Sequence, residues 1–262
     1  MSLPIFQVDT FTDHLFGGNP AGIVPLESWL PDGVMQQIAA ENNLAETAFF
    51  VKEPTGYRIR WFTPLAEVDL CGHATLASAY VLFNYLGFKG DFLEFQSRSG
   101  ILRVKRNGEF LILDLPTDIM VQVNISEDLV LAIGQSPVYA FKGKTDYMLV
   151  YETEEEIRKI QPNMHLLMQT EVRGVIVTAP GDEVDFVSRF FAPQVGIPED
   201  PVTGSAHTSL IPYWSKRLGK TEFSARQLSK RIGDLRCRFN GDRVEISGKA
   251  VIYLKGEIFN ET

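Results

Sequence analysis

Apolar and polar residues alternate along most of the chain, and this period of two is typical of half-buried β-strands. A period near 3.6 is rarer and predicts helices at residues 32–43, 126–133 and 154–161, with two more that follow Gly-x-Ala sequences. The pattern therefore favours a strand-rich α+β protein with few helices. The predicted strands are residues 4–11, 46–51, 57–62, 91–97, 100–106, 109–115, 173–179, 184–191, 243–248 and 250–259.

The first Gly-x-Ala helix, in "VDLCGHATLASAYVLF", has no side suited to water. From Ala74 to Leu86 it contains no charged residue, and Asn84 is its only side-chain amide. A helix that is apolar all round is a buried helix. Because strands dominate the sequence, we expect a curved sheet to wrap around it. The second such helix is less apolar, since Pro212 should kink it and Lys216 should return it to solvent.

The same order of features occurs twice, about half a chain apart. In "RWFTPLAEVDLCGHA" and "RFFAPQVGIPEDPVTGSA", an Arg-aromatic-aromatic strand leads to a proline, an acidic loop and a Gly-x-Ala helix start. We interpret this order as a duplication; convergence of two helix-packing segments is the alternative. The loosely corresponding residues are Asp69 and Asp200, and the corresponding helix starts are Gly72-His73-Ala74 and Gly204-Ser205-Ala206.

The duplication predicts two pseudo-symmetric lobes, each a sheet wrapped around its own buried helix. We place the first lobe at residues 1–120 and the second at residues 121–249. We leave open whether the terminal strand, at about residues 250–262, belongs to the first lobe.

Charge and composition exclude some classes of binding partner. The 262-residue chain has 33 acidic and 25 basic residues, a net charge of -8, so no field attracts it to nucleic acid or to an anionic membrane. Any anionic ligand must therefore be bound by local groups. No apolar run reaches the roughly 20 residues of a membrane span, and a cytoplasmic location is the default expectation. Cys71, Cys237 and four dispersed histidines lack metal-binding spacing, so we expect no metal site.

The two Gly-x-Ala helix starts are candidate anion sites. The first backbone N–H groups of an enclosed helix lack water, and with the positive end of the helix dipole they favour a carboxylate or phosphate. Gly72 and Gly204 would let a ligand approach the backbone closely. Duplicated halves should direct the two starts into one cleft. Ordinary capping by Ser205 or Thr203 is the alternative interpretation.

Glu46 is the most suggestive proton-transfer group. It stands in "NNLAETAFFV", where a helix ends and an apolar strand begins. Its apolar neighbours would desolvate it, and desolvation makes a carboxyl group a usable base and acid near neutrality. The alternative is an ordinary glutamate at the end of a strand.

Four segments carry a resemblance to a known family. "FGGNPAGIV", "LAETAFF", "RWFTPLAEVDLCGHAT" and "EDPVTGSAH", spread from residue 16 to residue 207, resemble the signature segments of the PhzF-like, or phenazine-biosynthesis-like, family. The resemblance implies a diaminopimelate-epimerase-like fold, with two pseudo-symmetric lobes that are each a β-barrel-like mixed sheet around a central helix. The family's best-understood member isomerises dihydro-hydroxyanthranilate without a cofactor, a glutamate removing and returning the proton.

The resemblance also implies roles for individual residues. The glutamate of "LAETAFF" is Glu46, and the catalytic set is Glu46, His73, Asp200 and Ser205. The substrate is implied to be a small, cyclic carboxylic acid, with no cofactor, and the protein a homodimer. The substrate-binding residues are expected to be Asn19, Pro20, Gly72, His73, Gly204 and Ser205.

Two other functions remain open on this scaffold. A two-thiol amino-acid racemase or epimerase would need a thiol at each helix start, but "EDPVTGSAH" has none, and Cys237 lies in the strand-like "LRCRF". A non-enzymatic protein that binds small acids is the second alternative. The roles of Cys71 and His207 are open, with His207 interpreted as structural support near the site.

Overall fold

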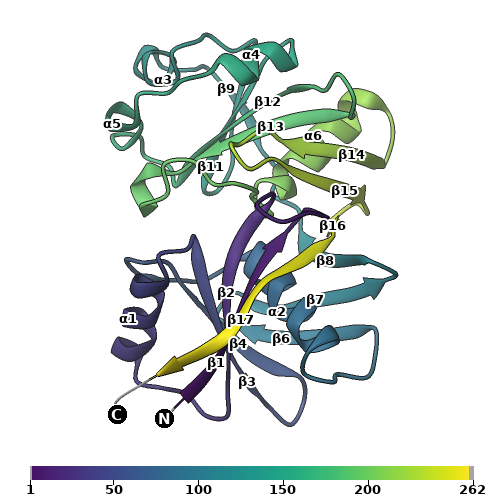
Figure 1. The fold of residues 1–262 in the computed structure, drawn as a ribbon. Coiled ribbons are helices and arrows are strands. Elements are labelled where there is room, and N and C mark those ends of the chain that lie inside the picture. Colours follow the sequence, from purple (N-terminus) through teal and green to yellow (C-terminus); the bar gives the residue numbers. More distant parts are fainter. Residues whose placement is uncertain (1, 260–262) are drawn as a thin grey trace. The chain divides into compact units, whose positions relative to one another are not determined.

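The computed structural model describes residues 2–259, which form two compact units (Figure 1). The first contains the chain up to Asp114 and again from Ser247, and the second is Leu115–Ile246. The lobe boundaries expected from the sequence, at residues 120 and 249, lie a few residues later in the chain than these observed boundaries. Of the expected terminal strand, residues 260–262 lie outside the described part. None of the helices within residues 2–259 has the length and apolar character needed to cross a membrane.

The first unit is one mixed sheet with a helix on each face. Its strand order is β17-β1-β2-β3-β4-β6-β7-β8, with the short β5 paired to β4. Its helices are α1 (Asp32–Asn42) and α2 (Gly72–Asn84). Its strands are β1 (Ser2–Thr10), β2 (Asn19–Leu26), β3 (Glu46–Lys52), β4 (Tyr57–Phe62), β5 (Glu67–Val68), β6 (Phe92–Ser97), β7 (Gly100–Asn107), β8 (Phe110–Pro116) and β17 (Ala250–Phe259).

Helix α2 lies inside the curve of this sheet. It contacts β1, β2, β3, β7 and β17, and every residue from Gly72 to Ala79 is buried. On the other face of the sheet, α1 packs Met35 against Phe49 and Phe62. The start of β3 is therefore covered on both faces, and its first five residues are buried. The expectation that the uncharged helix is enclosed by the sheet is confirmed.

The second unit repeats this plan. Its strand order is β9-β10-β11-β12-β13-β14-β15-β16. Its helices are α3 (Glu127–Ile133), α4 (Glu154–Lys159), α5 (Met164–Leu167) and α6 (His207–Leu218), with a 3-10 turn η1 at Pro193–Val195. Its strands are β9 (Val121–Val123), β10 (Tyr139–Lys142), β11 (Asp146–Val150), β12 (Gly174–Pro180), β13 (Phe186–Phe191), β14 (Glu222–Gln227), β15 (Gly233–Phe239) and β16 (Arg243–Gly248).

The pairing directions of the two sheets match strand by strand. Between β1, β2, β3, β4, β6 and β7 the pairings alternate antiparallel, parallel, antiparallel, parallel, antiparallel. The same alternation joins β10, β11, β12, β13, β14 and β15. In each unit the longest helix follows the fourth of these strands. Shared topology supports the duplication that the sequence suggested.

Candidate active site

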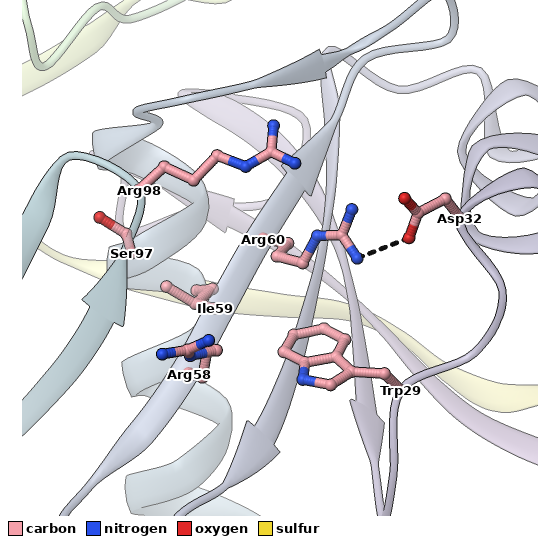
Figure 2. Close-up of a pocket in the computed structure, with 7 residues that line it drawn as sticks. All are labelled: Trp29, Asp32, Arg58, Ile59, Arg60, Ser97 and Arg98. Carbon is pink, nitrogen blue, oxygen red and sulfur yellow. Dashed lines mark hydrogen bonds and ion pairs between the residues drawn. The ribbon is translucent and has the colours of Figure 1, made fainter.

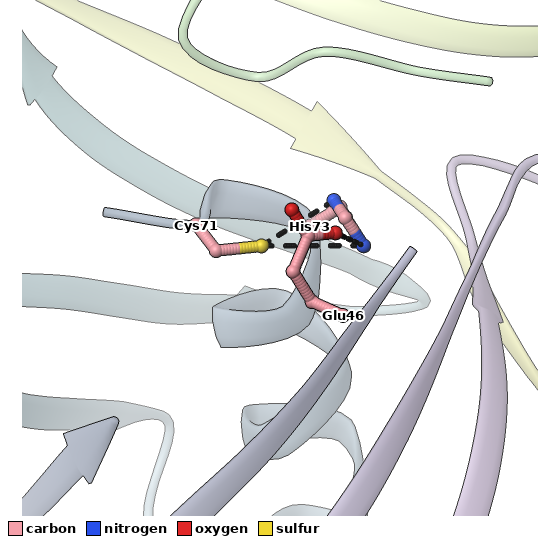
Figure 3. A group of neighbouring side chains, drawn as sticks. All are labelled: Glu46, Cys71 and His73. Atoms are coloured by element: carbon pink, nitrogen blue, oxygen red, sulfur yellow. Dashed lines mark hydrogen bonds and ion pairs between the residues drawn. The ribbon is translucent and has the colours of Figure 1, made fainter. Parts of the chain in front are cut away.

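Four polar side chains of the first unit meet at the N-terminus of α2. β2 and β3 run parallel with Ala21 beside Glu46, so Asn19 and Glu46 lie at the same end of these strands. Gly18 precedes Asn19 with φ +59°, and a Cβ there would lie 1.9 Å from the Thr10 carbonyl oxygen, so only glycine fits this turn. The cluster consists of Asn19, Glu46, Cys71 and His73, of which Figure 3 shows the last three.

His73 links the members of this cluster. Its Nδ1 lies 3.2 Å from Asn19 Nδ2, and its Nε2 lies 3.2 Å from Glu46 Oε2. The amide nitrogen can only donate, so Nδ1 accepts and the neutral ring carries its hydrogen on Nε2. Nε2 therefore faces the Glu46 carboxylate, close to Oε2 but without the geometry of a hydrogen bond. Cys71 Sγ lies 3.5 Å from Nδ1 and 4.0 Å from Nε2.

His73 is held in its neutral form. Burial lowers the pKa of His73 to about 3, because the imidazolium would have to be desolvated. Its place in the first turn of α2 also disfavours a positive charge. At neutral pH the ring thus carries no charge and faces Glu46 with its Nε2–H group.

Two buried histidines should make the protein less stable in mild acid. The folded pKa values of His73 and His207 are lowered by burial to about 3 and about 4, against an ordinary value of 6.5. Between these values the unfolded chain binds protons that the folded chain does not. Stability is therefore full above pH 6.5 and falls as the pH approaches the folded pKa values. From pH 7 to pH 5 we expect a loss on the order of 2 kcal/mol per histidine.

Urea unfolding at a series of pH values measures this effect. His73→Asn and His207→Asn should each flatten the pH dependence between pH 7 and pH 5, whatever their own effect on stability at pH 7. A wild-type unfolding free energy that does not change over this range would show that the two histidines are protonated in the folded state.

The cluster also contains three potential metal ligands. One ligand atom each from Glu46, Cys71 and His73 lies within 4.8 Å of the others. A carboxylate, a thiolate and an imidazole are ligands that zinc accepts. The spacing in the sequence predicted no metal site, and that reasoning missed this group because Glu46, in β3, is distant in sequence from Cys71 and His73 at the start of α2. Binding an ion would replace the direct contact between Glu46 and His73.

In the second unit, a hydrogen-bonded loop precedes α6. Thr203 Oγ1 donates to Asp200 Oδ2 at 2.6 Å, and His207 Nδ1 donates to the Thr203 carbonyl at 2.8 Å. The fully buried Gln227 donates to the Asp200 carbonyl and accepts from the Thr203 N–H, both at 2.8 Å. The loop that carries Asp200 is therefore fixed from both sides, and the buried His207 ring is part of this network.

The helix itself begins later than the sequence predicted. α6 starts at His207, and Gly204 and Ser205 lie in a turn that precedes it. In this turn the N–H of His207 donates to the Gly204 carbonyl, and the N–H of Thr208 donates to the Ser205 carbonyl. The expectation of a first helical turn at Gly204 is thus wrong by three residues. Gly204 is buried and Ser205 is half-buried.

Arg173 joins this second site and was not predicted. Its guanidinium binds both carboxylate oxygens of Asp146, through Nε at 2.9 Å and Nη2 at 2.5 Å. Nη2 also donates to Ser205 Oγ at 3.1 Å. Nothing in the local sequence "TEVRGVIV" marks this arginine; only the alignment of strands between the two units indicates its position.

Asp69 is not the counterpart of Asp200, contrary to the sequence comparison. In the first unit Val68 pairs with Trp61, and in the second Asp200 donates its N–H to Phe190, the residue equivalent to Trp61. Asp200 therefore matches Val68. The side chain of Asp69 is exposed and lies 3.8 Å from an arginine on the surface.

The Arg-aromatic-aromatic sequence that occurs in both halves of the chain has a structural basis, because the arginine forms an equivalent ion pair in each unit. Arg60 forms a bidentate ion pair with Glu67 at 2.7 and 2.8 Å, and Arg189 binds Glu199 in the same way. Figure 2 shows Arg60 in a surface cavity of about 520 Å³, where it also binds Asp32. None of the predicted site residues lines this cavity, whose lining residues are Trp29, Asp32, Arg58, Ile59, Arg60, Ser97 and Arg98.

The remaining predicted residues lie beside these clusters. Pro20 is half-buried on β2 next to Asn19, and Gly72 is the buried first residue of α2. Glu46, His73, Asn19, Pro20 and Gly72 thus belong to the first unit. Asp200, Gly204 and Ser205 belong to the second. The convergence of the two groups on one cleft stays a prediction.

Comparisons with known proteins identify the family. A family model described as "Phenazine biosynthesis-like protein" matches residues 8–256. An uncharacterized isomerase of Pseudomonas aeruginosa is 52% identical over 259 residues, covering 98% of this chain and 99% of the relative. The crystal structure of a PhzF-family phenazine biosynthesis protein from Enterococcus faecalis has a TM-score of 0.96 and 49% identity, over 99% of this chain and 100% of that one.

A more distant structure bears on the fold alone. A hydroxyproline epimerase from Agrobacterium vitis matches with a TM-score of 0.67 at 8% identity, over 98% of this chain and 92% of that one. The expected epimerase-like α+β fold and the family resemblance are both confirmed. The chain belongs to the phenazine biosynthesis-like protein family.

Proposed function

We propose that this protein is a cofactor-independent isomerase that removes a proton from a small, cyclic carboxylic acid and returns it to another position. The observation that carries the proposal is the buried Glu46 carboxylate, which lies 3.2 Å from Nε2 of the neutral His73 ring at the start of α2. The relative of Pseudomonas aeruginosa is named an isomerase, which is consistent with this activity.

In this mechanism Glu46 is both base and acid. Its carboxylate takes a proton from a carbon next to a π-system or a carboxyl-bearing carbon, and the same carboxyl group then gives the proton back. His73 lies beside Glu46 and is bonded to Asn19, which holds its ring next to the carboxylate. Backbone N–H groups at the start of α2 favour the negative charge that develops on the substrate. His73 itself need not change charge.

A paired-thiol racemase fits the residues less well. Cys71 lies at the start of α2, but Cys237 lies in β15, paired with Phe223 in the strand ladder. Burial raises the pKa of the Cys237 thiol well above its ordinary value, so it would not supply a thiolate. At the second helix start, the residue in the position of His73 is Ser205. One thiol cannot act from both faces of a carbon.

Hydrogen exchange in heavy water tests the proposal. Wild-type protein is incubated in heavy water with a panel of cyclic and aromatic-like carboxylic acids chosen by thermal shift, and deuterium at carbon is followed by NMR. We expect exchange at one carbon of at least one acid that binds. Acids that bind tightly without any exchange would favour the non-enzymatic, small-acid-binding alternative. The homodimer and the cytoplasmic location remain proposals that follow from the resemblance and from composition.

Metal removal and addition should have opposite effects. Because the proposed proton transfer uses only side chains, dialysis against EDTA should leave the exchange rate unchanged. Zinc should inhibit, since an ion held by Glu46, Cys71 and His73 would occupy the base. Exchange rates measured with EDTA and with added zinc check both expectations, and Cys71→Ala should weaken the zinc inhibition. Activity that EDTA abolishes and zinc restores would contradict the cofactor-independent mechanism.

A further inference from the structure

The last strand, β17, yellow in Figure 1, is the outer strand of the first unit's sheet, because β1 lies between it and β2. Its first three residues are half-buried, but five of its last seven are exposed. Leu254 is 42% and Phe259 82% exposed. An outer strand with exposed apolar side chains is a template on which a further strand can pair. The five exposed residues are Tyr253, Leu254, Lys255, Glu257 and Phe259.

The part of β17 that a partner could reach begins after Ile252. The Tyr80 hydroxyl of α2 lies against the backbone of Ile252, so this helix covers the start of the strand. After Ile252 a β-bulge shifts the register with β1, and regular pairing resumes at Leu254. Leu254 and Lys255 are consecutive and both exposed, so neither face of the strand is covered there. The available segment is therefore residues 254–259.

The order of residues in this segment is self-complementary. Lys255 and Glu257 stand on either side of Gly256. When two copies of the strand pair antiparallel about a two-fold axis at Gly256, Lys255 of each copy lies opposite Glu257 of the other. Leu254 likewise lies opposite Ile258. Opposite charges and apolar side chains directly across an antiparallel ladder stabilise it.

Neighbouring registers are unfavourable. An axis at Lys255 places two lysines opposite each other, and an axis at Glu257 places two glutamates opposite each other, which destabilises a ladder. An axis at Leu254 would need the backbone of Ile252, which lies against Tyr80. A lysine on an outer strand discourages pairing with most strands, but a second copy of β17 offers a glutamate to each lysine. One register is therefore favoured.

We propose that two copies of this protein associate through β17, which joins the sheets of their first units about a two-fold axis at Gly256. The proposal assigns a surface to the homodimer that the family resemblance implies. It uses only residues of the first unit, and it does not depend on the proposed isomerase chemistry. The two symmetric Lys255–Glu257 pairs set the register, and the exposed apolar side chains of the segment gain cover.

A cysteine at the proposed axis tests the register. A Cβ on Gly256 would meet Leu254 and Ile5 at 3.6 and 3.9 Å, which are ordinary contacts, so Gly256→Cys should keep the fold. Residues opposite each other in an antiparallel ladder have Cα atoms about 4.5–5.5 Å apart, a distance that a disulfide spans. Mild oxidation should therefore convert most of the variant to a covalent dimer on a non-reducing gel. The native thiols, Cys71 and Cys237, are buried and should not compete.

Gly33→Cys is the matched control for the crosslink. Gly33 is exposed in the first turn of α1, and a side chain there would point into open space. This variant should crosslink slowly under the same conditions. If Gly256→Cys crosslinks no faster than Gly33→Cys, with both variants shown to be folded by urea unfolding, the proposed axis is wrong.

Charge reversal tests the same contact by sedimentation equilibrium. Wild-type protein should sediment at twice the 29.4 kDa mass of the chain at micromolar concentration. Lys255→Glu should raise the dimer dissociation constant about 10-fold or more, because two attractive pairs become two repulsive ones. The double variant Lys255→Glu/Glu257→Lys should return it to within about 3-fold of wild type. Lys159→Glu, a reversal at an exposed residue of α4, should leave it unchanged.

Three outcomes would overturn the proposal. The first is wild-type protein that keeps the mass of one chain at about 100 µM. The second is a dimer that Lys255→Glu does not weaken, because its interface must then lie elsewhere. The third is a double variant as weak as the single reversal, which would reject the register. These measurements use no substrate, so their failure is distinct from a failure of hydrogen exchange, which tests the isomerase chemistry.

Discussion

Replacing Glu46 with glutamine should lower turnover by at least about 10²–10⁴-fold while the fold and the affinity for the acid stay near wild type. Glutamine has nearly the same shape, so the close contact of this side chain with His73 Nε2 should be kept. It cannot take up a proton. The loss should therefore appear in kcat and not in KM, measured on an acid that exchanges in heavy water.

Glu41→Gln is the matched control for this variant. Glu41 is an exposed residue of α1 close in sequence to Glu46, and its replacement should leave kcat unchanged. Undiminished turnover in Glu46→Gln, with folding confirmed by its unfolding curve, would contradict the assignment. The search for the proton carrier would then move to Asp200.

The largest loss of stability is expected from Trp214→Ala in α6. Trp214 is fully buried and stacks on Phe186, with ring centroids 5.6 Å apart and planes 4° from parallel. Its Nε1 also donates to Thr178 Oγ1 at 3.0 Å. Truncation would leave a cavity beside the helix that follows the Ser205 turn. Urea unfolding should show a loss of about 3–5 kcal/mol.

Trp214→Phe separates packing from hydrogen bonding. Phenylalanine keeps most of the stacking on Phe186 but leaves the Thr178 hydroxyl without this donor, so the loss should be smaller, about 1–3 kcal/mol. If the alanine and phenylalanine variants lost the same amount, the hydrogen bond and not the packed ring would be what stabilises α6.

The features that the sequence predicted are those that local pattern determines. The absence of charge from Ala74 to Leu86 is a property of one segment, and it was enough to predict an enclosed α2. The Arg-aromatic-aromatic repeat likewise reflects two local ion pairs, those of Arg60 and Arg189 with the glutamates that follow them. Glu46 and His73 were found because each lies within such a recognisable segment.

What the sequence missed depends on register and loop length. Arg173 meets Asp146 and Ser205 only because β11 and β12 pair in one register, and no local pattern fixes that pairing. Asp69 was matched to Asp200 because the three extra residues of the second loop were not located. They lie between Pro193 and Glu199, where the turn η1 accommodates them.

Hydrogen exchange measured separately from the substrate and from the product tests the central claim, that Glu46 alone removes and returns the proton. With one base, each direction of the reaction depends on the same carboxyl group. Glu46→Gln should therefore suppress deuterium incorporation from heavy water by at least about 10²-fold in both directions. If the variant retained wild-type exchange in one direction, a second group would be moving the proton there, and the single-base account would be wrong.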